Sequence, residues 1–483
     1  MKRISIILLT LFLAYSCTDN LEDRNVDTKN AATAAGETFF TGAQKNLTDD
    51  MASINVNTNV WRQFVQQITS TTYNDEANYN IANRKVPDGL WATMYRDVLN
   101  DLAESERIIK EAPAAPVGIG GTNVQKNQLA MIEVMNVYAY AILVETFGDI
   151  PYTEALDITN VLPKYDDGQT VYADLIARLS AAIANMDVAE DSFGGADLIY
   201  GGDVALWKKF ANSFKLRMGL VMYDVDATLG TATVQEAIAS GVFASNLDNA
   251  TFEYLDATPN TNPMWEDLVQ SGRKDFIVAK PFVDVLNTLN DPRRTVYFDD
   301  NIEDGYVGAV YGLNSSYGDF SHIGGIFYEA TLPHVLLDYA NVEFMMAEAA
   351  ELSLVGTPAD AAAHYDEAIT ASFDYYEVAD VATYLAQPSV AYATATGTWK
   401  EKIGTQKWIS LYNQGFLAWT EFRRLDYPAL VAPDTADDAA EGFVPRRFTY
   451  PIGEQTLNGD NYTTAAAAVG GDKLSTKLFW DKF

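Results

Sequence analysis

The chain has 483 residues, of which 48% are hydrophobic, so it is long enough to bury a large core. Its 66 acidic residues outnumber the 33 basic ones and give a net charge of −33 at pH 7. A surface this acidic repels phosphate backbones and anionic lipid headgroups, which disfavours binding to nucleic acid and direct adsorption to such membranes. The negative charge does not disfavour the binding of neutral ligands such as sugars.

Residues 1–16 have the pattern of a bacterial lipoprotein signal peptide. A basic start is followed by an apolar stretch from residue 4 to 14, shorter than the roughly 20 residues that a bilayer span needs. Ala14-Tyr15-Ser16-Cys17 resembles a lipobox, in which the signal is cut before the cysteine and the thiol is acylated. Cys17 is the only cysteine, and lipidation would explain a single thiol in a secreted chain. The alternative is an ordinary signal peptide that happens to end near a cysteine.

The rest of the chain is predicted to form a tether and one domain. Residues 17–30 are polar and acidic, which favours an acylated N-terminal tether, and residues 31–483 are expected to fold as a single domain. The segment 129–147 comes closest to a membrane span. Because Glu133, Asn136 and Glu145 interrupt it, we expect a buried core helix there.

Apolar residues at helical spacing dominate the predicted domain. The helices come in pairs joined by short breaks, as after residue 147, where Gly148 and Pro151 end a helix. This pattern favours tetratricopeptide-like hairpins, with an irregular all-α domain as the alternative. The predicted helices cover residues 91–109, 130–145, 171–186, 207–221, 339–349, 361–372, 400–412 and 416–424.

Three long segments between these helices are predicted to be rich in loops: 46–88, 226–333 and 426–483. Short strands are expected inside them, for instance at Thr295–Phe298. Loops this long in a compact domain are usually functional.

Six sequence blocks carry a resemblance to a known family: Leu90–Tyr95, Phe147–Tyr152, Trp207–Met218, Ala340–Ala350, Thr405–Trp408 with Glu421–Arg424, and Arg446–Pro451 with Glu454. In this order, they resemble the SusD/RagB family of nutrient-binding outer-membrane lipoproteins, and more narrowly its SusD-like subgroup. The resemblance implies a mainly all-α, SusD-like fold with tetratricopeptide-like helix pairs and long loop-rich insertions carrying short strands. It also implies that Trp207 and Trp408 serve the core.

The resemblance implies a function in capture rather than catalysis. Such a protein is a surface-exposed lipoprotein of the outer membrane that binds an oligosaccharide or polysaccharide. It delivers this ligand to a SusC-like TonB-dependent transporter, acting as its lid. The acidic run behind Cys17 resembles the surface-export signal of lipoproteins in the Bacteroidetes, with a plain solvated linker as the alternative. The alternatives are a peptide ligand in the same architecture, a cell-surface glycosidase, and a purely structural scaffold.

Sugar binding needs aromatic faces for the C–H surface of the ring and planar polar groups for its hydroxyls. Three loop regions combine both: 61–79, 254–276 and 306–328. The alternative for each aromatic residue is local packing under a long loop. Trp61→Ala or Trp265→Ala is expected to weaken binding without unfolding the protein. The candidate ligand contacts are Trp61, Tyr73, Asn74, Asp75, Tyr79, Trp265, Arg273 and Tyr317.

No cofactor and no catalytic residue is predicted. The three histidines, His322, His334 and His364, are spread apart without metal-binding spacing, and no Gly-x-Ser-x-Gly nucleophile motif occurs. The acidic run from residue 299 to 304 offers oxygen ligands for calcium but lacks the EF-hand spacing, so a solvated loop is favoured over a calcium site.

Overall fold

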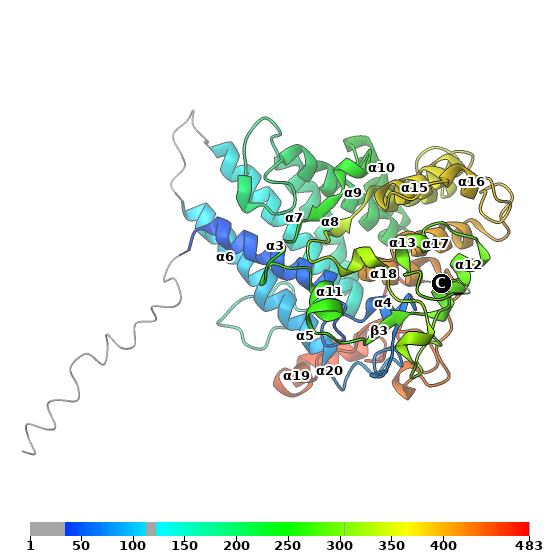
Figure 1. The fold of residues 1–483 in the computed structure, drawn as a ribbon. Helices are drawn as coiled ribbons and strands as arrows, with labels where there is room; N and C mark the ends of the chain where they lie inside the picture. Colours follow the sequence, from blue (N-terminus) through cyan, green and yellow to red (C-terminus); the bar gives the residue numbers. More distant parts are fainter. Residues whose placement is uncertain (1–33, 113–121, 304, 483) are drawn as a thin grey trace, which may run out of the picture. The chain divides into compact units, whose positions relative to one another are not determined.

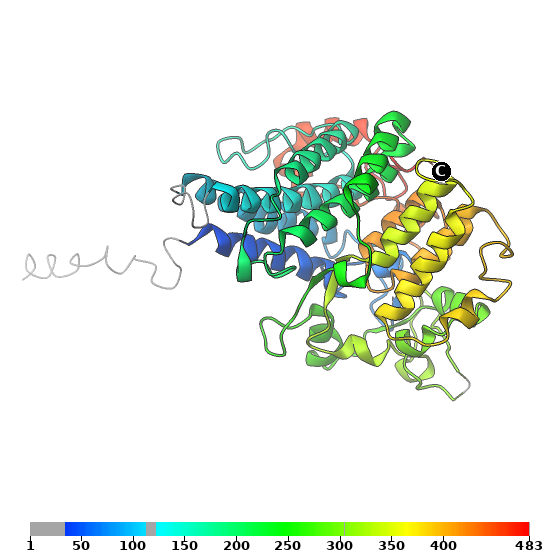
Figure 2. The same cartoon turned by 90° about the horizontal axis from the view of Figure 1, so that it is seen from above.

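The computed structural model describes residues 34–112, 122–303 and 305–482. Gly36–Phe483 form one compact unit that is built mainly from helices (Figures 1 and 2). Most long helices pack against a helix close to them in the sequence, as the hairpin pattern predicts. These pairs are α3 (Gly36–Ala52) with α6 (Asn100–Glu111), α7 (Thr122–Phe147) with α8 (Gly168–Asn185), α9 (Val204–Tyr223) with α10 (Ala227–Ser240), α14 (Tyr339–Glu351) with α15 (Ala361–Tyr375), and α17 (Trp399–Ser410) with α18 (Gly415–Leu425).

Helix α7 lies in the middle of this packing and is apolar almost all round. Among the described residues it is the one helix long and apolar enough to cross a membrane, yet 89% of its most apolar window is buried by the protein itself. A helix covered on all sides needs no polar face, which explains its composition. The prediction of a buried core helix is therefore confirmed. The helix stops before Gly148, whose φ of +89° suits a residue without a side chain.

A buried network of ion pairs joins the helix pairs. Glu421 in α18 contacts Lys407 of α17 at 2.8 Å and Arg424 of its own helix at 2.6 Å. Arg424 also pairs with Glu348 of α14, and Arg217 of α9 lies 3.7 Å from Glu421. All of these side chains are almost fully buried. These charged residues of the family-like blocks thus hold helices together.

The helices differ from the prediction in several places. Residues 86–111 are helical throughout, because a π-helix, η1 (Thr93–Leu99), joins α5 (Val86–Ala92) to α6. Helix α3 extends to Ala52 and α10 begins at Ala227, so two loop-rich segments begin with helix. The remaining short helices are α4 (Trp61–Phe64), η2 (Gly194–Ala196), η3 (Asn246–Asp248), α11 (Pro263–Trp265), η4 (Glu266–Gln270), α12 (Lys280–Thr288), α13 (Arg294–Tyr297), η5 (Tyr317–Asp319), η6 (Gly325–Tyr328), α16 (Val381–Leu385), η7 (Asp438–Ala440), α19 (Ile452–Leu457) and α20 (Gly459–Ala468).

Short antiparallel strands occur in the loop-rich segments, as expected. They form two pairs, β1 (Ile68–Ser70) with β3 (Phe276–Val278) and β2 (Ala250–Phe252) with β4 (His334–Leu337).

The strand predicted at Thr295–Phe298 is wrong, because Arg294–Tyr297 form the single helical turn α13. The Asp291 carboxylate accepts the Arg293 N–H at 2.9 Å at the start of this turn, and such a local bond favours a turn over a strand. Only Phe298 pairs in the manner of a strand, with Ile323.

Both tryptophans that the family-like blocks assign to the core are buried. The Trp207 indole N–H donates to the Asp197 carboxylate at 2.7 Å, and the Trp408 N–H donates to the Val65 carbonyl at 2.9 Å. Burial therefore leaves neither polar N–H without a partner.

Candidate ligand-binding site

The β1–β3 pair brings the first two predicted contact regions side by side. Ser70 pairs with Phe276 at the end of the two strands, and the Thr71 N–H donates to the Asp275 carbonyl at 2.8 Å. The Thr71 hydroxyl also donates to the Lys274 carbonyl at 2.8 Å. Because the paired strands are short and buried, the polar residues that follow β1 and precede β3 meet at one edge.

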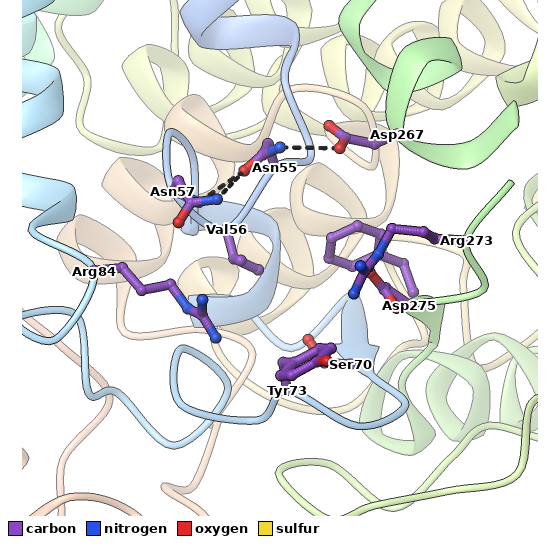
Figure 3. Close-up of a pocket in the computed structure, with 10 residues that line it drawn as sticks. Asn55, Val56, Asn57, Ser70, Tyr73, Arg84, Asp267, Arg273 and Asp275 are labelled. Atoms are coloured by element: carbon purple, nitrogen blue, oxygen red, sulfur yellow. Dashed lines mark hydrogen bonds and ion pairs between the residues drawn. The ribbon is translucent and has the colours of Figure 1, made fainter. Parts of the chain in front are cut away.

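At this edge lies an open cavity of about 430 Å³, a volume typical of small-ligand sites (Figure 3). Its walls come from the loop after α3, from the segment between β1 and α5, and from η4 and the loop before β3. The residues that line it are Asn55, Val56, Asn57, Ser70, Tyr73, Arg84, Asp267, Arg273, Asp275 and Phe276.

Tyr73 is the exposed aromatic residue of this cavity, with 54% of its surface accessible. Arg84 and Arg273 extend toward the space beside its ring from opposite sides (Figure 3). Their guanidinium carbons lie 5.8 and 5.4 Å from the ring centre, within the range of cation–π attraction. The two arginines therefore restrain the ring while leaving much of it open to solvent.

Each guanidinium is compensated by a carboxylate. Arg84 lies 2.5 Å from Glu76 and 3.3 Å from Asp75, and Arg273 pairs with Asp275. The Glu76 side chain is fully buried, and this burial raises its pKa to about 7 although Arg84 opposes the shift. A cavity with compensated charges offers N–H donors without a net positive field, which suits uncharged ligands with hydroxyl acceptors.

The opposite wall carries planar polar groups (Figure 3). The Asn55 side chain donates to the Asp267 carboxylate at 2.9 Å and accepts from the Asn57 amide at 2.7 Å. Burial raises the pKa of Asp267 to about 6. Such amides and carboxylates are the groups that hydrogen-bond sugar hydroxyls, so the cavity combines an aromatic ring with polar edges.

The structure brings some of the predicted contacts together. Tyr73 and Arg273 both line the cavity, and Asp75 lies at its edge through its pair with Arg84. The side-chain amide of Asn74 instead contacts that of Asn314, which joins two of the predicted loop regions.

Trp61 and Tyr79 are fully buried, so the structure contradicts their prediction as ligand contacts. The Trp61 ring lies 5.1 Å from Phe416 and is part of an aromatic core. The Tyr79 hydroxyl accepts from the Gln66 amide at 3.1 Å, and its ring packs on Phe64. With no accessible face, neither ring can stack on a sugar.

Trp265 and Tyr317 do not line the cavity. Trp265 is half-buried in α11. Tyr317 stacks on His322 with 3.9 Å between the ring centres, and the Lys274 ammonium lies 5.2 Å from the Tyr317 ring centre. A ligand contact by either residue stays a prediction.

Six polar residues of the cavity are not among the predicted contacts: Asn55, Asn57, Ser70, Arg84, Asp267 and Asp275. The signal for the first two is the asparagine-rich run from residue 55 to 59, directly after α3. Ser70, Asp267 and Asp275 lie inside the predicted regions 61–79 and 254–276. Arg84 lies outside the predicted regions, and only the fold places it beside Tyr73.

Two further predictions remain untested. Cys17 and its acylation lie outside the described residues. In the described parts of the chain, no group of three or more His, Cys, Asp or Glu side chains is arranged to hold a metal ion, and Asp304 of the acidic run is itself not described.

Comparison with known families gives one match over most of the chain. Residues 27–451 match the SusD-like family that is described as starch-binding and associating with the outer membrane. None of the curated protein sequences matches this chain.

Solved structures with the same fold are numerous. A chitin-binding protein is 25% identical, with a TM-score of 0.79, and the match covers 93% of this chain and 100% of that one. A SusD homologue from Bacteroides uniformis is 24% identical with a TM-score of 0.78, covering 92% and 99%. A chitin-binding SusD homologue from Flavobacterium johnsoniae is 22% identical with a TM-score of 0.77, covering 92% and 98%. The mainly helical fold and its short strands are therefore confirmed.

Proposed function

The chain belongs to the SusD-like family, and on that premise we propose that it binds an oligosaccharide or polysaccharide in the cavity beside Tyr73. The single observation that carries this proposal is an accessible aromatic ring held between Arg84 and Arg273 and facing amide and carboxylate groups. The apolar face of a sugar would pack on the ring, and its hydroxyls would bond to the polar side chains.

The charge balance of the cavity supports a ligand without strong charge. Arg84 and Arg273 are both paired with carboxylates, so neither offers an unpaired positive charge that would bind an anionic ligand. Two of the structural neighbours carry chitin-binding names, and this makes oligomers of N-acetylglucosamine the first ligands to test.

The proposed cellular role is capture and delivery. The protein would be anchored to the outer membrane through acylated Cys17, face outward, and pass its ligand to a SusC-like TonB-dependent transporter over which it acts as a lid. The lipobox-like Ala14–Cys17 and the family description support this role. Purification of the native protein from membranes, with mass spectrometry of its N-terminus, tests the anchor. Co-purification of a β-barrel transporter tests the partner.

The proposed role includes no covalent chemistry. Asp267 accepts a hydrogen bond from Asn55, and Asp275 pairs with Arg273, so each carboxylate of the cavity already has a positioning contact. Incubation of the purified protein with any oligosaccharide that it binds should return that oligosaccharide intact. Release of shorter products that depends on Asp267 would favour a glycosidase instead.

A glycan array followed by calorimetric titration tests ligand binding. We expect at least one oligosaccharide to bind, and Tyr73→Ala to weaken that binding. An array on which no glycan binds would contradict the proposal.

A further inference from the structure

A second cavity, of about 520 Å³, shares a wall with the first. Asn55 and Asp267 line both cavities. The second one extends from there along α3 and η1 to the loop that carries α11. Its lining residues are Lys45, Asn46, Asp49, Asp50, Ser53, Asn55, Thr58, Thr93, Asp97, Pro259, Thr261, Pro263, Glu266 and Asp267.

Acidic residues dominate this second cavity, with five Asp and Glu side chains and one lysine. Lys45 is already paired with Asp49, and Asp97 pairs with Arg96 at 2.6 Å. Glu266 accepts only the Thr261 hydroxyl, at 2.8 Å. In the described part of the chain, Glu266, Asp267 and Asp50 therefore lack an ion-pair partner, in contrast to Arg84 and Arg273 beside Tyr73, which are both paired.

Asp50 differs from the other acidic residues that line the second cavity. It is only 3% exposed, it borders the cavity, and neither oxygen of its carboxyl group has a hydrogen-bond partner among the described residues. Burial, together with the charge of Asp49, raises its pKa to about 8. A buried carboxyl group without a partner is costly, so a ligand that supplies a cationic donor would stabilise it.

The geometry favours an extended organic cation over a metal ion. Within the described ranges, no three acidic, histidine or cysteine side chains converge as metal ligands would. The carboxylates are instead spread along the cavity from α3 to η4. Separated carboxylates suit ammonium groups that are repeated along a chain.

We propose that this second cavity binds the protonated amines of a glycan that carries unacetylated amino sugars, while a neighbouring sugar of the same glycan occupies the cavity beside Tyr73. The inference rests on the proposed function and narrows its substrate class. Because the two cavities share Asn55 and Asp267, one linear oligosaccharide can enter both.

Two hexamers of the same backbone test the inference: the β-1,4-linked glucosamine hexamer, which carries free amines, and its fully N-acetylated counterpart. Titration of each into the full protein should show tighter binding of the amino hexamer, by about tenfold. In about 1 M salt, where the Debye length falls to about 3 Å, this preference should shrink.

Matched variants show whether the second cavity causes the preference. Glu266→Gln and Asp50→Asn should each lower the ratio of the two affinities, whereas Glu106→Gln, on the exposed face of α6, should leave the ratio as it is. Because two cavity variants are measured, a folding defect in one of them does not decide the test. A thermal melt of each variant checks that it is folded.

Several results would overturn the inference: equal affinity for the two hexamers, tighter binding of the acetylated one, no binding of the amino hexamer, or a ratio that Glu266→Gln and Asp50→Asn do not change. The proposed function is tested separately. A neutral oligosaccharide whose binding depends on Tyr73 would keep that function even if the amine site fails.

Discussion

The guanidinium carbon of Arg273 lies 5.4 Å from the centre of the Tyr73 ring, although the two residues are far apart in the sequence. The pairing of β1 with β3 produces this contact, since it places Tyr73, two residues after Thr71, beside the loop before Phe276. Arg84 approaches the same ring at 5.8 Å. The cavity is therefore built on a strand pair rather than on loops alone, and its central ring has a defined position.

The two arginines of the cavity should differ in their effect on stability. Arg84→Gln leaves the fully buried Glu76 without its cation, so we expect a loss of about 1–3 kcal/mol in the free energy of unfolding. Arg273 pairs with Asp275 at an exposed position, where solvent screens the ion pair, so Arg273→Gln should cost less than Arg84→Gln. Urea unfolding of both variants measures the difference. Equal losses would mean that Glu76 does not depend on Arg84.

Trp61→Ala should destabilise the protein rather than affect binding alone. The ring is fully buried against Phe416 and Phe448, and removal of a large aromatic side chain from a core costs about 3–5 kcal/mol. Trp265→Ala is the matched control, because Trp265 is only half-buried, and it should lower the free energy of unfolding by less. If Trp61→Ala melts at the same temperature as the wild type, the core tolerates the void that the missing ring leaves.

Glu421 should contribute to stability in a pH-dependent way. Burial opposes its ionisation, but Arg424, Lys407 and Arg217 outweigh burial and hold its pKa well below the ordinary value of 4.5. A lowered pKa in the folded state stabilises the protein above pH 4.5, and this contribution is lost as the pH falls through the lowered pKa.

We therefore expect Glu421→Gln to cost about 3–5 kcal/mol near neutral pH, because it leaves buried cations unpaired. The difference from the wild type should shrink as the pH falls below 4.5. Denaturant unfolding over a pH series measures it, with the exposed Glu106→Gln as control. A difference that stays constant with pH would contradict the assigned cause.

Asp50→Asn should stabilise the ligand-free protein at alkaline pH. The pKa of Asp50 is raised from 3.8 to about 8, so the folded state holds a proton that the unfolded state releases. Stability attributable to this group falls as the pH rises from 3.8 to 8, by about 1.4 kcal/mol per pH unit. The variant should thus melt higher than the wild type near pH 8, and the two should converge at acidic pH. A variant that melts lower near pH 8 would mean that ionised Asp50 is stabilised in the fold.

The helical scaffold could be predicted from the sequence because periodicity reports directly on burial. The stripe that starts at Trp207 and the apolar segment that ends before Gly148 both form helices at the expected places. The error at Thr295–Phe298 has a local cause: β-branched and aromatic residues favour a strand, but the Asp291–Arg293 contact starts a helical turn.

The cavity could be predicted only in part. Tyr73 and Arg273 were identified as aromatic and planar polar residues in loops, and both line it. The same criterion also selected Trp61 and Tyr79, which are buried, since a loop sequence does not show which rings face inward. Arg84 was missed because its position beside Tyr73 depends on the path of the chain between β1 and α5.

The most direct test of the proposed function is the affinity of the purified protein for its array-selected oligosaccharide with and without the Tyr73 ring. Tyr306→Ala is the matched control, because Tyr306 also lies beside an arginine, Arg294 at 5.7 Å, but does not line the cavity. We predict that Tyr73→Ala weakens binding by about tenfold or more while Tyr306→Ala leaves it unchanged. Equal affinities of wild type, Tyr73→Ala and Tyr306→Ala would show that this cavity is not the glycan site.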